Sequence, residues 1–383
     1  MKQFSDKRTE KFALKTDFLG SVFLLLALFV VAGAGSNRES HDLILESARS
    51  NENRLSGGEF VSILRGDVVF TYGDQRISSA EATWWKNRGA VNFRRDVRVE
   101  RPSQLITCDR MSFTRDDNLL HGSGNFHFFD TLEHTTIRAS DARYRIDTGE
   151  LVLRGNPEIE RVDTVEGDTL VITGEQMIYT DEDKVAVVEG GVGISKGALS
   201  ATSAKADYHT QSGSLFLRSM PQISYESHTV KGDMAELFFG EEKLEWARMI
   251  GNAFVVYNDY TSDTTDTMLT RIWGDTLLLT LRESGDLDSL YAYGNVITRY
   301  HALNDTVYVN KTSGREMVLS FGDGGVLDNV LIRGNARSVY YIEQDDGRGR
   351  NEASGDSLTV IFEEGKTRRI RLSGSTRGMY YSR

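Results

Sequence analysis

The sequence predicts an all-β fold of stacked strands, and two observations support this prediction. A segment with apolar side chains at alternate positions recurs ten times between residues 64 and 380, each time around a small central residue. Such alternation is typical of a half-buried strand, because successive side chains of a strand point to opposite faces of the sheet. After residue 50, no stretch has the period of a long amphipathic helix.

Glycine is the central residue in eight of the ten copies. The central residues are Gly66, Arg95, Gly124, Gly155, Gly190, Ser219, Gly251, Gly294, Gly334 and Gly374. The apolar residues lie an even number of positions from each central residue. We therefore place the central residues on the same, apolar face of the strand. A glycine lets a strand bend sharply or lets another backbone approach closely. We therefore expect each segment to fold over at its central residue, and only Arg95 and Ser219 depart from the pattern.

The inward column carries bulky apolar side chains in the first seven copies. The residues of this column that we expect to line the interior are Phe70, Val97, Val99, Phe126, Phe128, Ile159, Val192, Ile194, Ile223 and Val255. Four residues after the centre, the last three copies instead carry Thr298, Ser338 and Gly378. This change predicts a wider or wetter interior toward the carboxyl end. Six residues after the centre, tyrosine recurs in six copies, at Tyr72, Tyr225, Tyr257, Tyr300, Tyr340 and Tyr380.

A second strand-like element precedes most of these segments. It consists of a small residue followed five positions later by a large apolar one, as in Ala80 and Trp85 or Cys108 and Phe113. The residue after the small one is acidic in six copies, at Glu81, Asp109, Glu175, Asp233, Asp275 and Asp356. We interpret these acids as charges at the strand entry that keep the outer face soluble.

Repeats of this kind predict one elongated body over residues 43–383. Central residues lie at most 35 positions apart as far as Gly251 and at least 40 apart beyond it, and the added length is rich in Ser, Thr, Asp and Gly. Repeats near this period are typical of one supersecondary unit stacked on itself, in which each copy buries its apolar face against its neighbours.

Residues 1–35 have a different composition and predict a membrane-targeting segment. A net-basic start leads into an apolar run from Phe18 to Ala34, which we expect to form a single hydrophobic helix. The small residues at 32–34 resemble a signal-peptidase site, so we expect a cleaved signal peptide; a retained membrane anchor is the alternative. Either way the repeats are exported. The chain carries a net charge of −11, which argues against nucleic acid as a partner.

The sequence contains no recognisable catalytic or metal-binding motif. HExxH and CxxC are both missing, and GxSxG matches only at residues 193–197, inside an expected strand. The lone cysteine, Cys108, lies in an expected strand and is interpreted as a small buried residue. We expect His121 and His127 to be solvated on the outer face, and we read the acidic loop at 259–266 as solvated rather than as a calcium site. The sequence therefore predicts no enzyme activity, no metal and no cofactor.

Three segments resemble the OstA-like repeat of the LptA/LptC lipopolysaccharide-transport proteins. They are residues 77–85, 90–99 and 290–297, and the resemblance extends over about residues 43–381. It implies an elongated, V-shaped β-jellyroll of mostly antiparallel strands, also called a β-taco, whose interior holds the acyl chains of lipopolysaccharide or a related glycolipid. It also implies a periplasmic, non-enzymatic protein that joins other jellyrolls of a transport bridge through terminal edge strands, with possible inner-membrane contact through residues 1–35.

The chain departs from that family in its length, and two alternatives stay open. It has about twice the repeats expected of the family's short soluble bridge protein. Its last copy has no polar cap, so we expect an open edge that invites strand addition. The alternatives are an exported structural or surface β-solenoid with a packed interior, and a polysaccharide-binding β-helix. The β-helix is disfavoured because its rungs are usually shorter and no carboxylates cluster here.

Overall fold

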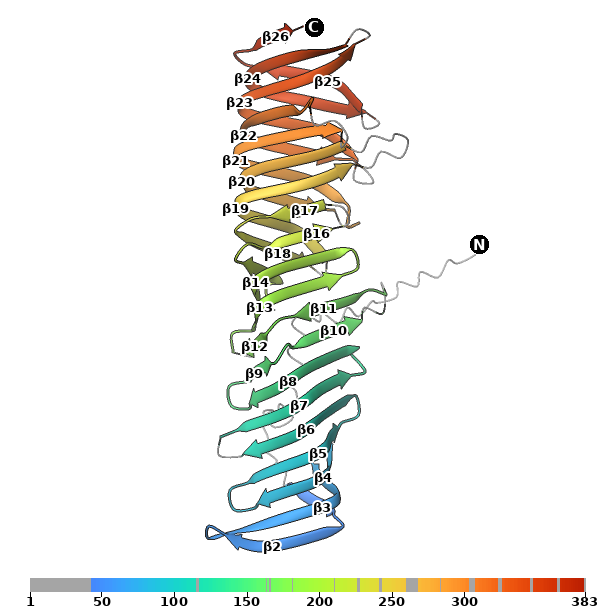
Figure 1. The fold of residues 1–383 in the computed structure, drawn as a ribbon, viewed down its shortest axis with the longest axis vertical. Coiled ribbons are helices and arrows are strands. Elements are labelled where there is room, and N and C mark those ends of the chain that lie inside the picture. The colour runs from blue at the N-terminus through green and yellow to red at the C-terminus, as the bar shows by residue number, and fades with distance from the viewer. Residues whose placement is uncertain are drawn as a thin grey trace, which may run out of the picture.

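The described chain is an elongated stack of β-strands that runs from β2 (Ser50–Ser56) near one end to β26 (Arg377–Tyr381) at the other (Figure 1). The computed structural model describes residues 43–381, apart from gaps at 115–116, 163, 165–166, 181, 210, 226–227, 241–242, 260–267, 283, 303–306, 323–325, 345–346 and 364–365. The hydrophobic helix expected within residues 1–35 lies outside this range. Within the described residues, no helix is long and apolar enough to cross a membrane.

The strands follow one another closely along the chain. The first half contains β1 (Ile44–Ser47), β3 (Glu59–Tyr72), β4 (Gln75–Trp85), β5 (Ala90–Glu100), β6 (Gln104–Thr114), β7 (Leu119–Asp130), β8 (Thr135–Arg145), β9 (Glu150–Arg154), β10 (Glu158–Val162), β11 (Thr169–Thr173), β12 (Gln176–Thr180) and β13 (Val185–Lys196). The second half contains β14 (Leu199–His209), β15 (Ser214–Arg218), β16 (Gln222–Tyr225), β17 (His228–Lys231), β18 (Met234–Gly240), β19 (Lys243–Asp259), β20 (Met268–Leu281), β21 (Leu287–Ala302), β22 (Asn310–Phe321), β23 (Leu327–Gln344), β24 (Gly347–Glu363) and β25 (Lys366–Ser373).

Neighbouring strands pair in antiparallel fashion throughout the described stack. This pairing confirms the predicted fold class of stacked antiparallel strands. It also excludes the parallel β-helix, because the rungs of that fold pair in parallel.

The strands fold over at the ten predicted central residues. In β3, the register with β4 shifts between Arg65 and Val68, and both Gly66 and Asp67 between them have positive φ angles, 75° and 48°. Arg95 and Ser219 adopt the same left-handed conformation as the glycines, with φ of 62° and 67°. Two successive left-handed residues turn the strand, so each long strand continues in a second layer after its corner.

The corner glycines face outward, so their predicted place on the apolar face is wrong. A Cβ atom added to Gly124 would meet the carboxylate of Asp109, and one added to Gly251 would meet that of Asp233; both carboxylates are exposed. Positive φ at two consecutive residues interrupts the alternation of side chains, so parity does not fix the direction of the central residue.

The acidic column packs against these corners and does more than keep the surface soluble. The Asn125 amide donates a hydrogen bond to the Asp109 carboxylate, with an Nδ2–Oδ2 distance of 3.1 Å. The Asn252 amide donates one to Asp233 over 3.0 Å. Each of these acids therefore binds the corner of the next long strand and helps to hold it in the left-handed conformation.

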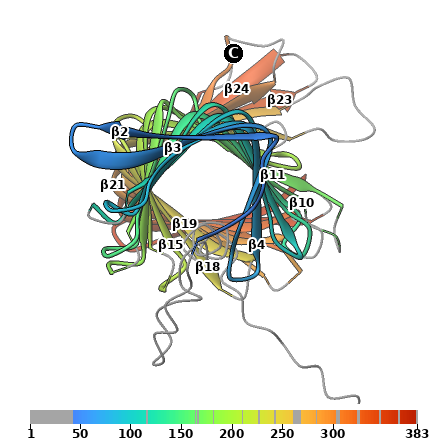
Figure 2. The ribbon, with the colours of Figure 1, turned by 90° about the horizontal axis from the view of Figure 1, so that it is seen from below.

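The corners divide the stack into two walls that enclose one interior, as the view along the axis shows (Figure 2). We call the halves of the long strands before the corner, with their paired neighbours, the first wall, and the halves after it the second wall. In the fourth and sixth copies a proline follows the corner pair, at Pro157 and Pro221. The strand is interrupted there, between β9 and β10 and between β15 and β16, because proline cannot donate to the ladder.

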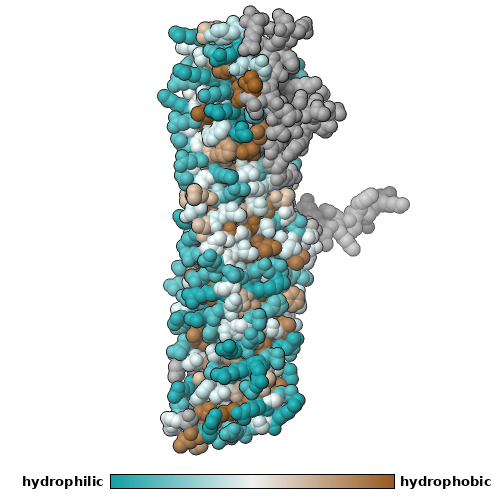
Figure 3. Space-filling view, in the orientation of Figure 1, coloured by the Kyte–Doolittle hydropathy of each residue, from teal (hydrophilic) through white to brown (hydrophobic). Residues whose placement is uncertain are grey.

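The two walls pack against each other in one continuous core. A single cluster of buried residues extends from Leu64 to Leu358. Near the amino-terminal end, the ring of Phe70 in the second wall contacts Trp84 and Phe93 of the first wall edge to face, with centroid distances of 5.3 and 5.5 Å. Cys108 lies in this core, as predicted. The face of the stack drawn in Figure 3 is mostly hydrophilic, with scattered apolar patches.

Candidate functional site: the interior between the walls

All ten residues predicted to line the interior belong to this core. Eight of them are buried, and Ile194 and Ile223 are half-buried and pack against the core from its edge. Their inward direction is therefore as predicted, and their role in binding a lipid stays a prediction. His127 and Arg154, the outward neighbours of this column, are half-buried and exposed respectively.

In the amino-terminal copies, side chains fill the interior. A cavity of about 20 Å³ lies among Ile106, Met111, Gly122, Phe126 and further residues of β7 to β9. That is the space of about one water molecule. A Cβ atom added to Gly122 would lie 2.9 Å from the Phe126 ring, so the missing side chain makes room for this phenylalanine. An acyl chain can enter this part only if the walls separate.

The interior changes character in the last three copies. On the first wall, neighbouring strands place a row of apolar side chains inward, namely Leu290, Leu319, Val330, Val360 and Ile370. On the second wall, the corresponding inward rows carry Thr, Ser, Asn and Tyr instead. One wall is therefore apolar and the other is polar and aromatic.

Exposure rises toward the carboxyl-terminal end on both walls. On the second wall, Thr298 is buried, Ser338 is half-buried and Gly378 is exposed. On the first wall, Leu290 is buried, whereas Ile370 is 46% exposed. This gradient agrees with the predicted wetter interior: the inward side chains of the last strands are exposed at the carboxyl-terminal end of the stack, which we call the mouth.

The tyrosine column lies along the second wall of the last copies. The rings of Tyr300 and Tyr340 are tilted, with centroids 6.3 Å apart. The pKa of the Tyr300 hydroxyl lies far above its usual range. The main cause is burial, and the charge that the neighbouring Tyr340 can carry adds to it. Tyr380 at the mouth is 49% exposed. The Tyr300 phenol therefore stays protonated at physiological pH and acts as a neutral hydrogen-bonding group.

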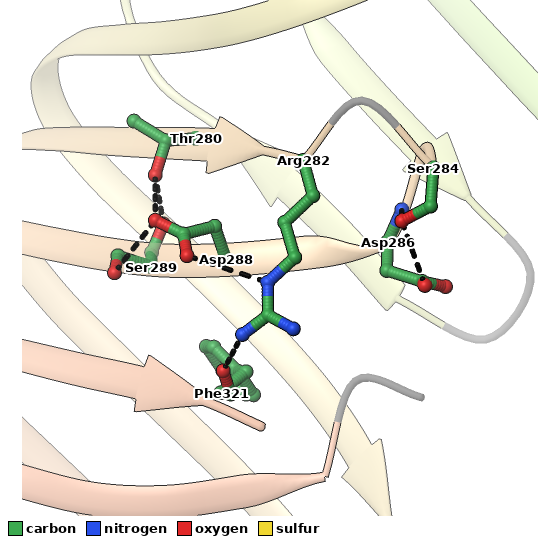
Figure 4. A network of polar contacts seen from close by, with 7 residues as sticks. All are labelled: Thr280, Arg282, Ser284, Asp286, Asp288, Ser289 and Phe321. Atoms are coloured by element: carbon green, nitrogen blue, oxygen red, sulfur yellow. Dashed lines mark hydrogen bonds and ion pairs between the residues drawn. The ribbon is translucent and has the colours of Figure 1, made fainter. Parts of the chain in front are cut away.

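A polar network fastens the outer edge of the first wall (Figure 4). Arg282 donates to the Phe321 carbonyl of β22 and also lies 3.4 Å from Asp288 of β21, measured between Nε and Oδ1. Thr280 of β20 donates to the same carboxylate over 3.3 Å. The network joins three successive strands, and its charged groups Arg282 and Asp288 pair with each other. We therefore interpret it as structural.

The described residues contain no candidate metal site. Within them, no group of three or more His, Cys, Asp and Glu side chains could hold a metal ion. Two members of the predicted acidic loop, Asp263 and Asp266, lie outside the described residues. His121 contacts Asp141 on the outer face, and burial together with Arg138 lowers the pKa of His127.

Both ends of the stack expose apolar side chains and strand edges. At the amino-terminal end these are Ile44, Leu55 and Phe60. At the other end they include Met379 and Tyr381 of β26, which pairs with β24 alone among the described strands. The predicted open edge is present.

Two features of the interior and its corners escaped the sequence analysis. The residue after each centre is Asn, Asp or Gly in eight copies, and these residue types tolerate a left-handed backbone better than others. That signal marks a two-residue corner. The polar row on the second wall becomes visible only once the register between strands is known, because the register places Asn310 and Asn351 beside the tyrosines.

No family model matches the chain, and no curated protein matches it. Among solved structures, one similar chain is LptH of Pseudomonas aeruginosa, described as the LptA-homologous periplasmic component of the lipopolysaccharide transport device. The two are 15% identical, the match covers 36% of this chain and 76% of LptH, and the TM-score is 0.19. At these values the similarity assigns no function to this chain.

Proposed function

We propose that the protein binds a glycolipid, such as lipopolysaccharide, by its acyl chains between the two walls and carries it without chemical change. The observation that carries this proposal is the continuous cluster of buried apolar side chains from Leu64 to Leu358, which lies between the walls and gives way to exposed inward side chains at the carboxyl-terminal mouth. Burying an acyl chain requires no specific polar contact, since each methylene contributes roughly 0.8 kcal/mol.

Entry of a chain requires the walls to separate where they are packed. The breaks at Pro157 and Pro221 remove ladder hydrogen bonds beside the corner, and the half-buried Ile194 and Ile223 lie in the same middle copies. In this middle region the second wall is therefore both interrupted and only half-buried at part of its inward column. It is the place where we expect the walls to part first.

The proposal places the protein in the periplasm as one section of a transport bridge. The exposed edges at both ends support strand addition by other jellyroll proteins. The sequence of residues 1–35 supports export, with either a cleaved signal or contact with the inner membrane.

A charge at the edge of the interior tests this function. Ile194→Asp should weaken lipopolysaccharide binding about tenfold or more, because an acyl chain beside Ile194 would then desolvate a carboxylate. Ser195→Asp puts the same charge on the outward face of β13 and serves as the control. Binding of fluorescent lipopolysaccharide reports affinity, and circular dichroism checks the fold. Equal affinity of the two folded variants contradicts acyl-chain binding at this place.

A packed structural solenoid is the second candidate, and the closed interior of the amino-terminal copies favours it. In that case the walls never part, and no amphiphile binds between them. The two candidates differ in one observable, which is the labelling of inward residues by lipid.

A further inference from the structure

The second wall carries two parallel rows of neutral polar side chains near the carboxyl-terminal mouth. One row runs across β21 to β23 through Thr298, Thr312 and Ser338. The next row runs through Tyr300, Asn310, Tyr340, Asn351 and Tyr380, from β21 to β26. Both rows continue the inward face of Val296 and Ala336, which are fully buried.

The deep end of these rows is internally satisfied, and the outer end opens to solvent. Thr298 and Thr312 are hydrogen-bonded to each other, and the side-chain amide oxygen Oδ1 of Asn310 accepts a hydrogen bond from the backbone N–H of Tyr341 over 2.9 Å. Toward the mouth, Asn351 is half-buried and Tyr380 is exposed. The groups of the outer end are therefore within reach of a ligand that enters from the mouth.

The chemistry of the two walls at the mouth is complementary to an amphiphile. Tyrosine offers an apolar ring with a polar tip, and asparagine offers both donors and acceptors. The described inward residues of these rows include no charged side chain, so a phosphate or carboxylate would find no counter-charge there. Across the interior, Val360 and the exposed Ile370 present only apolar surface.

We propose that the mouth holds an uncharged, polyhydroxylated group, the saccharide part of a glycolipid, on the Tyr340, Asn351 and Tyr380 wall. The acyl part of the same molecule lies against the facing wall of Val360 and Ile370. This inference rests on the proposed function and adds the orientation of the ligand. It assigns recognition of the sugar to the carboxyl-terminal mouth, because the polar groups of the amino-terminal second wall, such as Asp130 and Thr135, are fully buried.

The test compares two amphiphiles that share a twelve-carbon tail and differ in the head group. Dodecyl maltoside carries a neutral disaccharide, and dodecyl octaethylene glycol ether carries a polyether without hydroxyl-rich rings. Isothermal titration calorimetry on the full chain, below both critical micelle concentrations, gives the two affinities. We expect at least fivefold tighter binding of the maltoside.

A double variant at the mouth, Tyr340→Phe with Asn351→Leu, should weaken maltoside binding about five- to tenfold and leave ether binding unchanged. The control is Tyr293→Phe with Asn329→Leu, which makes the same changes on the outward face of β21 and β23. It should keep the preference. Melting temperature and circular dichroism confirm that both variants are folded.

Each remaining outcome overturns the inference in a distinguishable way. Equal affinity of the wild type for both amphiphiles, or an equal loss of both in the mouth variant, removes the saccharide site and leaves acyl-chain binding in place. Binding of neither amphiphile removes the proposed function and this inference together.

Discussion

At the scale of single residues, each strand folds over at its corner residues. At two corners, non-glycine residues occupy the strained left-handed conformation. Ser219 and Met220 both have positive φ angles, 67° and 56°, although neither is glycine, asparagine or aspartate. A left-handed backbone costs an ordinary residue about 1–2 kcal/mol. Arg95 is in the same position, but its guanidinium pairs with Glu81 of the neighbouring strand.

Ser219→Gly should therefore raise the free energy of unfolding by about 0.5–1 kcal/mol, because glycine removes the strain but adds entropy to the unfolded chain. Urea denaturation measures the change. Ser200→Gly, on the exposed face of extended β14, is the matched control and should lower stability by a similar amount. A loss of stability in both variants would show that the corner at Ser219 is not strained.

Cys108 links burial to a pH dependence. Burial raises the pKa of its thiol from 9.0 to about 12. Below pH 9 the folded and unfolded states both hold the proton; between pH 9 and 12 only the folded state does, so stability falls as pH rises. The fall is at most roughly 1.4 kcal/mol per pH unit. Between pH 9 and 10.5, the free energy of unfolding of the wild type should therefore fall by about 1.4 kcal/mol more than that of Cys108→Ala, as measured by urea denaturation at each pH. An equal pH dependence of the two proteins would contradict a buried thiol.

At the scale of elements, the terminal strand β26 is the edge most exposed to a partner. Its outward side chains are Arg377, Met379 and Tyr381, and all three are exposed. Natural edge strands block pairing with charge, and beyond Arg377 the outward side chains of β26 carry none.

Met379→Lys with Tyr381→Lys should abolish concentration-dependent association of the full chain, because two charges on one edge oppose strand addition. Analytical ultracentrifugation over a hundredfold range of concentration measures this. Tyr293→Lys, an exposed tyrosine in the middle of the stack, is the control and should associate like wild type. If the edge variant associates as strongly as this control, the contact lies elsewhere.

Much of the element order was predictable, and the failures have a physical reason. Alternation predicts strands because one face of each wall is buried, as Phe70 and Phe128 show. The same alternation fails at Gly124, where two left-handed residues interrupt it and turn the glycine toward Asp109. Sequence also gives no register between strands. The side-by-side placement of Tyr340 and Asn351 therefore appears only in the structure.

At the scale of the whole molecule, the interior becomes more polar toward the carboxyl-terminal end. In the amino-terminal copies the second wall is apolar four residues after the corner, and contacts such as Phe70 with Phe93 close the interior; polar side chains such as Asp130 and Thr135 lie buried farther from the corner. The carboxyl-terminal copies have one apolar and one polar wall and open at Ile370 and Tyr380. A ligand that moves along the interior would therefore meet a closed, mainly apolar segment at the amino-terminal end and an exposed, amphipathic segment at the carboxyl-terminal end.

The central claim is that acyl chains lie between the walls, and site-specific photo-crosslinking tests it most directly. A photoreactive residue is placed inward at Phe128 or Ile194 and outward at His127 or Arg154, and each folded protein is irradiated with lipopolysaccharide. The account predicts glycolipid adducts from the two inward positions only. Equal labelling from both sets, or no labelling from the inward set, would contradict it and favour a permanently packed solenoid.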